Sequence, residues 1–240
     1  TLEHVKKSKL KFTYSANNLG LCTAINLAAK LSTTDYILYA HDDMYFCPDW
    51  EDHLIKEINF IKHENFYFSG TMIEPNSGHI KLDCGSNYKN FDETKLLKEF
   101  NNNTFFDHQG SHFAPHLVTK KIWNKVGGFS EEFNPGIGSD PDFNMKLWQL
   151  NIRIFKGINK FRVYHFSSIT TRKKKGVIQN KGDITFLKKW GISSKFFKKH
   201  YLKSMTEYTG PLLEPKKNLS FILGLLFCKI KLIYLKLLNK

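Results

Sequence analysis

The chain has 240 residues, of which 41% are hydrophobic and 15% aromatic, so it is long and apolar enough to bury one domain. This composition excludes an intrinsically disordered chain. The formal net charge is +14, and the excess lies in residues 172–240, where 17 Lys and Arg accompany 3 Asp and Glu; this predicts a basic helical tail after a domain over residues 1–171.

Predicted strands and helices alternate in the first part of the chain. Residues 10–14 have the pattern of a short strand, and apolar residues follow at helical spacing over residues 21–31. Residues 36–40 form an apolar run typical of a buried strand, and an amphipathic helix is predicted through residues 54–61. This order is typical of a mostly parallel sheet covered by helices, which is the α/β class.

The later elements continue this pattern. Strands are predicted over residues 66–73, 152–154 and 161–164, residues 116–118 lead into a helix over residues 120–126, and a further helix is predicted over residues 141–150. The Asn-rich region 86–103 has no clear periodicity and is predicted as a long loop of the kind that forms lids or substrate loops.

The 36–40 strand ends in His41, Asp42 and Asp43. Ligands of open α/β sheets usually bind at the carboxyl ends of the strands, and hard divalent cations prefer carboxylate oxygens. We therefore predict a metal, a phosphate-bearing ligand or both at this point, with Asp43 as the metal ligand. The residues alone leave open that one of the two acids caps the following turn.

A second acidic site is predicted where the 141–150 helix begins. Asp140 precedes Pro141, an order typical of a helix start, and a glycine-containing loop comes before it. Asp140 is therefore a helix cap, a general base that takes a proton from an acceptor hydroxyl, or both.

His165 follows the last predicted strand. A histidine in this position is commonly a hydrogen-bonded structural residue. With His41 and Asp43 it also matches the His-x-Asp…His ligand set of non-haem iron oxygenases. Those enzymes are all-β double-stranded helices, whereas this chain alternates strands with helices, so this function is a minor alternative.

Several motifs, in this order, resemble inverting family-two glycosyltransferases of the GT-A fold. They are Asn18-x-Gly20 with Ala24 and Asn26, His41-Asp42-Asp43 followed by Pro48 and Trp50, Val126-Gly127-Gly128-Phe129 with Glu132 and Phe133, Asp140-x-Asp142-Phe143, and His165 with Lys189-Trp190-Gly191. The resemblance runs from about residue 11 to residue 191. It implies a GT-A-like mixed, mostly parallel sheet flanked by helices, and transfer of a sugar, with inversion, from a nucleoside-diphosphate sugar to a glycan or lipid-linked acceptor.

The resemblance also implies a donor and metal site. The D-x-D motif of the family falls on residues 41–43, so Asp42 and Asp43 are expected to bind the donor, and Asp43 to hold Mn²⁺ or Mg²⁺. His41 replaces the first acid of that motif, and imidazole is an acceptable manganese ligand. His165 matches a position that approaches the metal or the diphosphate.

The E-D-x-D motif of the family falls on residues 139–142. The resemblance therefore implies that Asp140 is the base and Asp142 a supporting acid in a single displacement at the anomeric carbon. Asn18 and His112 are further expected in the nucleotide-sugar site, His112 toward the acceptor.

The family normally opens with a strand, a helix and a second strand that hold the nucleotide. A βαβ unit takes on the order of 30 residues or more, and nine residues precede Leu10 here. The chain is therefore expected to be truncated, or its nucleotide pocket incomplete.

Residues 219–238 are strongly apolar but contain Lys229, Lys231 and Lys236. Such a segment is typical of an amphipathic helix at the bilayer surface, whereas a spanning helix needs about 20 uninterrupted apolar residues. The alternative is a helix packed on the domain or on a partner. Four scattered cysteines without a C-x-x-C pair fit a reducing compartment, so we expect a cytoplasmic protein, peripheral at the inner face of the membrane.

A second function is a catalytically degenerate transferase fold that uses its basic tail to hold an anionic ligand, either lipid or nucleic acid. For the enzyme itself, nucleic acid is not an expected partner.

Overall fold

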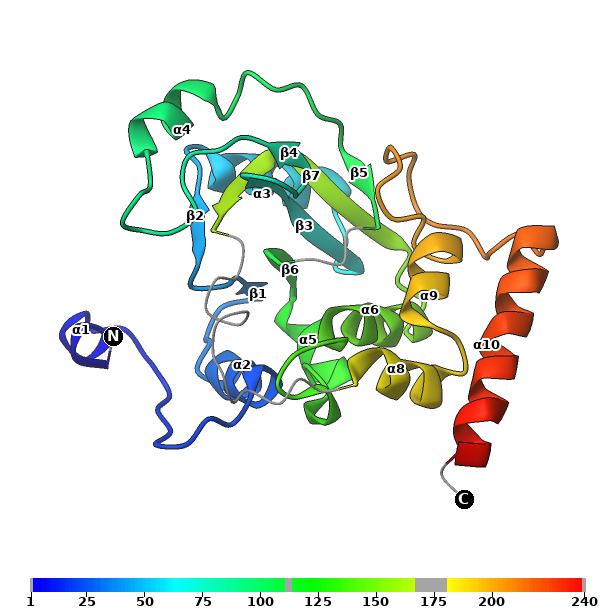
Figure 1. Cartoon of the computed structure of the whole chain (residues 1–240). Coiled ribbons are helices and arrows are strands. Elements are labelled where there is room, and N and C mark those ends of the chain that lie inside the picture. Colours follow the sequence, from blue (N-terminus) through cyan, green and yellow to red (C-terminus); the bar gives the residue numbers. More distant parts are fainter. Residues whose placement is uncertain (1, 111–113, 167–180, 239–240) are drawn as a thin grey trace.

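The computed structural model describes residues 2–110, 114–166 and 181–238. Its strands form one seven-stranded sheet with helices on both sides (Figure 1). The strands are β1 (Tyr36–Tyr39), β2 (Met44–Phe46), β3 (Phe66–Glu74), β4 (Ile80–Lys81), β5 (His108–Gln109), β6 (His116–Thr119) and β7 (Ile154–His165). The helices are α1 (Leu2–Lys7), α2 (Leu21–Lys30), α3 (Trp50–Ile61), α4 (Glu93–Glu99), α5 (Lys120–Val126), α6 (Ser139–Gln149), α8 (Gly182–Trp190), α9 (Ser194–His200) and α10 (Leu219–Leu238), with a 3₁₀ turn at Glu131–Phe133.

The sheet is mixed, as predicted, and its strands follow the order β1-β6-β3-β7-β2, with β4 beside β3 and β5 beside β7. The predicted parallel majority is wrong, because four of the six strand pairings among the described residues are antiparallel. The reason is β2, a three-residue strand too short to show periodicity, which pairs antiparallel with β7, and β6, which enters antiparallel between β1 and β3.

The central strand β3 is buried along its whole length and divides two hydrophobic cores. Phe66 and Phe68 point to one face, where they pack with Leu54 of α3, whereas Tyr67 points to the other face, against Phe155 and the helices α5 and α6. Successive residues of a strand face opposite sides, so an apolar run without alternation fits a strand covered on both faces.

Three local predictions differ from the structure. Residues 10–14 form no strand, and Leu10 is 68% exposed, because within the described residues no strand pairs with them. The Asn-rich region contains the helix α4, which Asp92 caps by accepting a hydrogen bond from the Lys95 backbone N–H at 2.9 Å. The two strands predicted at 152–154 and 161–164 are one twelve-residue strand, β7.

The helices α8, α9 and α10 pack against one another and share the core that contains α6. The segment between α9 and α10 is tied to the sheet, since the Gln109 N–H of β5 donates to the Thr206 carbonyl at 2.7 Å and the Leu212 N–H donates to the Arg153 carbonyl at 2.7 Å. The predicted boundary at residue 171 falls outside the described residues, so this division of the chain stays a prediction. In the part of the chain that the structure describes, no helix has the length and apolar character needed to cross a membrane.

Candidate active site

His41, Asp43 and His165 lie together although Asp43 and His165 are 122 positions apart in the sequence. The pairing of β2 with β7 aligns Met44 with His165, and this register places Asp43, the residue before β2, beside the end of β7. Asp43 Oδ1 lies 3.3 Å from His165 Nε2 and 3.8 Å from His41 Nδ1. One ligand atom from each residue lies within 4.8 Å of the others, so this donor set of two imidazoles and a carboxylate suits a divalent transition metal such as Mn²⁺.

The second ring nitrogen of each histidine has its own partner. Glu74, the last residue of β3, places Oε1 2.5 Å from His165 Nδ1, and the Tyr39 hydroxyl lies 2.7 Å from His41 Nε2. Metal-binding histidines commonly use the second nitrogen in this way, and the contact fixes the tautomer and the ring orientation. The nitrogens that remain, His165 Nε2 and His41 Nδ1, are those that approach Asp43.

The charges in this cluster are coupled. Burial lowers the pKa of His165, but the hydrogen bonds and charges of Asp43 and Glu74 outweigh burial and raise this pKa to about 9. Burial raises the pKa of Asp43, but His165 and His41 outweigh it and hold this pKa below its usual value. A protonated His165 therefore joins two carboxylates, and a cation bound at His165 would take the place of that proton.

Asp140 faces the same cavity as the histidines. It lies in the first turn of α6, and its Oδ1 is buried without a hydrogen-bond partner among the described residues. Burial, opposed by the charge of Lys198, raises the pKa of Asp140 to about 7. The cavity has a volume of about 550 Å³, and its lining includes His41, Glu74, His79, Ala114, Asp140, His165 and Met205. A carboxylate that lines a cavity, has a pKa near neutral pH and keeps one oxygen without a partner among the described residues has the properties of a general base.

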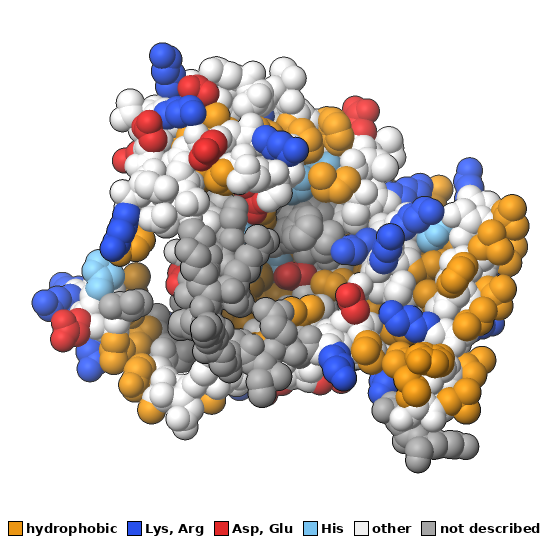
Figure 2. Space-filling view, in the orientation of Figure 1, with side chains coloured by type: hydrophobic (Ala, Val, Ile, Leu, Met, Phe, Trp, Pro, Cys, Tyr) orange, Lys and Arg blue, Asp and Glu red, His pale blue; other side chains and the backbone are white. Residues whose placement is uncertain are grey.

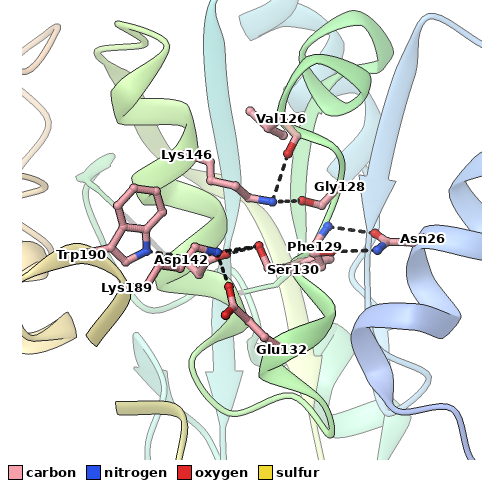
Figure 3. Close-up of polar contacts among 10 residues, drawn as sticks. All are labelled: Asn26, Val126, Gly128, Phe129, Ser130, Glu132, Asp142, Lys146, Lys189 and Trp190. Carbon is pink, nitrogen blue, oxygen red and sulfur yellow. Dashed lines mark hydrogen bonds and ion pairs between the residues drawn. The ribbon is translucent and has the colours of Figure 1, made fainter. Parts of the chain in front are cut away.

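Asp142 lies on a different face of α6, since residues two apart on a helix do not face the same side. Its side chain is fully buried and accepts hydrogen bonds from Ser130 Oγ at 2.6 Å and Trp190 Nε1 at 2.8 Å (Figure 3). It also pairs with Lys189 at 2.9 Å, and Lys189 in turn pairs with Glu132 at 2.6 Å. Asp142 is not among the residues that line the cavity, so its predicted supporting role stays a prediction, and its contacts are those of a residue that positions α6.

Several other motif residues hold the same region together. The Asn26 side chain of α2 donates to the Phe129 carbonyl and accepts from the Phe129 N–H, both at 2.8 Å (Figure 3). Lys146 of α6 donates to the carbonyls of Val126 and Gly128. These contacts fasten α2, the loop after α5 and α6 to one another, and thereby fix the helix that carries Asp140.

The remaining predicted site residues are placed differently. Asn18 is exposed before α2, where its side chain accepts a hydrogen bond from the Gly20 N–H at 2.9 Å. Asp42 is exposed and is not part of the cavity lining. His112 lies outside the described residues. The structure therefore brings His41, Asp140 and His165 to one cavity, with Asp43 beside the two histidines, and Asn18, Asp42 and Asp43 are not part of the cavity lining.

Sequence reasoning missed Glu74, Tyr39, His79 and Met205. Glu74 carried a usable signal, because an acid follows the predicted 66–73 strand just as Asp42 and Asp43 follow the 36–40 strand. Met205 carried no such signal, because it lies in an irregular segment of the chain. Hydrogen bonding to β5 brings this segment to the cavity, and the Met205 N–H donates to the Gln109 carbonyl at 3.2 Å.

A protein-family model agrees with the resemblance. The family model described as glycosyl transferase family 2 matches residues 1–122. No curated protein sequence matches the chain. Among solved structures, the chain is similar to a crystal structure of GalNAc-T7 with UDP, GalNAc and Mn²⁺, with 16% sequence identity and a TM-score of 0.49. The match covers 68% of this chain and 34% of GalNAc-T7, so the chain spans about a third of that protein's length.

Proposed function

Because the chain belongs to glycosyl transferase family 2, we propose that it transfers a sugar from a nucleoside-diphosphate sugar to a hydroxyl of a glycan or lipid-linked acceptor, with inversion. The observation that carries the proposal is that Asp140 lines the same cavity as His41 and His165, and His165 lies 3.3 Å from Asp43. A candidate base and a candidate diphosphate and metal site thus face one space of about 550 Å³, a volume typical of small-molecule pockets.

We infer that His41, Asp43 and His165 hold Mn²⁺ or Mg²⁺. Their mixed nitrogen and oxygen donors, and the Glu74 carboxylate that orients His165, fit Mn²⁺ better than Mg²⁺, which prefers oxygen ligands. Such a cation, when bound, offsets the negative charge on the leaving diphosphate.

Asp140 supports an inverting mechanism. Its carboxylate would take the proton of the acceptor hydroxyl while the hydroxyl oxygen forms a bond to the anomeric carbon and the bond from that carbon to the diphosphate oxygen breaks. Attack opposite the leaving group inverts the anomeric centre. The other acid that lines the cavity, Glu74, is held by His165 and Ser77, so Asp140 is the better base and Glu74 a poor second nucleophile.

We further propose a cytoplasmic location. All four cysteines are free and buried, which fits a protein that folds in a reducing compartment. Nucleic acid is not a proposed partner. An iron oxygenase is not the proposed function, because the family is a transferase family and the sheet is flanked by helices rather than closed into a double-stranded β-helix.

The test is transfer or hydrolysis with a panel of UDP- and GDP-sugars in the presence of Mn²⁺. Asp140→Asn is expected to lower kcat by about 10²- to 10⁴-fold, the usual contribution of a general base, and Asp43→Ala to remove the dependence on Mn²⁺ together with most of the activity. Asp52→Asn, an exposed acid of α3, serves as the matched control and should leave turnover unchanged. Wild-type turnover in both site variants would refute the assignment of the site. A lack of turnover with every donor, together with retained lipid binding, would favour the degenerate binding protein.

A further inference from the structure

The helix α10 is attached to the protein by one of its two apolar faces. The inner face packs into the core of α6, α8 and α9, with Phe221 and Cys228 buried. The Phe221 ring lies 5.0 Å from the Phe196 ring, and the Ser193 N–H donates to Cys228 Sγ at 3.3 Å. These contacts fix the rotation of the helix, so the side chains on the opposite face have a defined direction.

The outer face of α10 is also apolar, and it is exposed. Ten large apolar side chains recur along it at helical spacing, each at least 48% exposed. They are Leu219, Ile222, Leu223, Leu226, Phe227, Ile230, Ile233, Tyr234, Leu237 and Leu238. Figure 2 shows hydrophobic side chains gathered along the edge of the molecule where α10 lies. A contiguous exposed patch of this kind marks an interaction surface.

Positive charge borders this outer face on both sides. With about 100° of rotation per residue, Lys229 and Lys236 lie along one border and Lys231 lies along the other. No Asp or Glu occurs in residues 216–238. Lysines in such positions extend their aliphatic stems along the apolar surface and keep their ammonium groups at its edge.

A groove lies between α9 and α10, on the side of Lys231. It has a volume of about 470 Å³, and its lining includes Lys195, Lys199, Phe227 and Lys231. The Lys199 ammonium donates to Ser220 Oγ at 3.0 Å, which joins the two helices across the groove. Three ammonium groups beside an aromatic wall suit a phosphate that carries an apolar chain.

We propose that the outer face of α10 lies in the surface of an anionic lipid bilayer, with a lipid phosphate in the groove between α9 and α10. An apolar stripe with flanking lysines and no acids has the charge complementarity of an interfacial helix. A second copy of the chain fits less well, because pairing of two outer faces would bring lysines together without an acid on α10 to neutralise them. This inference goes beyond the proposed function and does not depend on it.

The experiment is flotation of the full chain with vesicles of phosphatidylcholine alone or mixed with phosphatidylglycerol. We expect binding to the mixed vesicles that weakens steeply with salt. Leu226→Ser with Ile230→Ser on the outer face should weaken binding by about tenfold or more, since each buried leucine or isoleucine contributes about that factor. The matched control is Ile55→Ser with Phe60→Ser, which removes two exposed apolar side chains from α3 and should have no effect.

The groove is tested by Lys195→Gln, Lys199→Gln and Lys231→Gln together. This triple variant should bind the anionic vesicles on the order of tenfold more weakly and show a shallower salt dependence, because each lysine near an anionic surface adds several-fold to binding. Lys6→Gln, Lys7→Gln and Lys9→Gln, at exposed positions near the N-terminus, are the charge-matched control.

Circular dichroism and light scattering accompany these measurements. Vesicle binding that the outer-face variant retains in full, or that both lysine triples reduce equally, would overturn the proposal. It would also fail if the wild type did not bind vesicles but formed a dimer that the outer-face variant dissociated.

Discussion

At the scale of single residues, Asp140 is half-buried, and its Oδ1 is buried without a hydrogen-bond partner in the part of the chain that the structure describes. Carboxylates in proteins are usually exposed or hydrogen-bonded, and an unpartnered buried acid destabilises the fold when ionised. Since natural proteins accept such strain mainly at functional sites, Asp140 is the residue of this cavity whose chemistry most needs an explanation.

The raised pKa of Asp140 predicts how stability depends on pH. In the unfolded chain an aspartate loses its proton near pH 4, whereas in the folded chain Asp140 holds it to about pH 7. The folded state therefore binds more protons between these two values, and stability contributed by Asp140 falls as the pH rises through this window.

Asp140→Asn removes this ionisation and should raise Tm relative to the wild type, by more at pH 7.5 than at pH 5. At pH 7.5 we expect a gain of about 2 °C or more, the shift that about 1 kcal/mol produces in a chain of this size. Thermal melts followed by circular dichroism at both pH values measure it, with Asp52→Asn as control. An equal gain at the two pH values would contradict the assignment of the pKa to Asp140.

Glu74 is predicted to position His165 for the metal. Glu74→Gln keeps the shape of the side chain but removes its charge, so Mn²⁺ should bind about 10- to 100-fold more weakly, as is usual when such a partner is changed. Isothermal titration with Mn²⁺ measures this affinity. Ser77→Ala removes a different hydrogen-bond partner of Glu74 and leaves the contact with His165, so it should change the affinity much less. Equal effects of the two variants would argue against a positioning role.

The sequence revealed the residues at strand ends but not their partners. Asp43 and His165 stand out because each follows an apolar run, and Asp140 because it precedes a proline at a helix start. Glu74 and Tyr39 act through contacts that depend on which strands are neighbours, and a pattern within one segment does not contain that information. Asn18 matches the family motif in the sequence, but in the structure its side chain accepts a hydrogen bond from the nearby Gly20 N–H and does not line the cavity.

At the scale of elements, α6 is held by Asp142, a fully buried acid that contacts three side chains. Asp142 contacts Ser130, Lys189 and Trp190, and it thereby joins α6 to α8 and to the turn at Glu131–Phe133. Truncation of Asp142 leaves the Ser130 and Trp190 donors without this acceptor, whereas Lys189 keeps its pair with Glu132.

Asp142→Ala should therefore lower the free energy of unfolding by about 1–3 kcal/mol, the usual cost of leaving a buried hydrogen-bond donor without its acceptor. Urea unfolding followed by tryptophan fluorescence measures this change. Lys121→Ala breaks the exposed pair between Lys121 and Glu64 and should change the free energy of unfolding by less than about 1 kcal/mol. A loss of activity in Asp142→Ala without loss of stability would instead support a direct role in the chemistry.

The strand β7 shows why some elements could not be predicted. Its middle, with Lys156, Gly157 and Asn159, interrupts the apolar pattern that identifies a strand. The structure supplies the compensating contacts, because Lys156 pairs with Glu57 at 2.7 Å and with Asp107 at 2.9 Å, and the His108 ring packs where a Gly157 side chain would lie. Tertiary partners therefore override the local propensity.

At the scale of the whole molecule, the α/β class and most helices could be predicted because their periodicity is local. The strand order could not, since it depends on β2 and on the insertion of β6 between β1 and β3. Whether the tail is separate from the domain depends on tertiary contacts that a local pattern does not contain. In the structure, Phe186 of α8 and Phe197 of α9 share a core with Trp148 of α6.

The segment between α9 and α10 connects the cavity that Asp140 lines to the helix α10. Met205 lines the cavity of Asp140, and hydrogen bonds from residues 205–212 hold this segment against β5 and the start of β7 before the chain enters α10. If α10 rests on a bilayer and Asp140 is the base of the proposed transfer, the Asp140 carboxylate lies at a fixed distance from the lipid surface. Acceptors whose hydroxyl lies at that distance from the membrane would receive the sugar, whereas acceptors whose hydroxyl lies nearer to the membrane or farther from it would not.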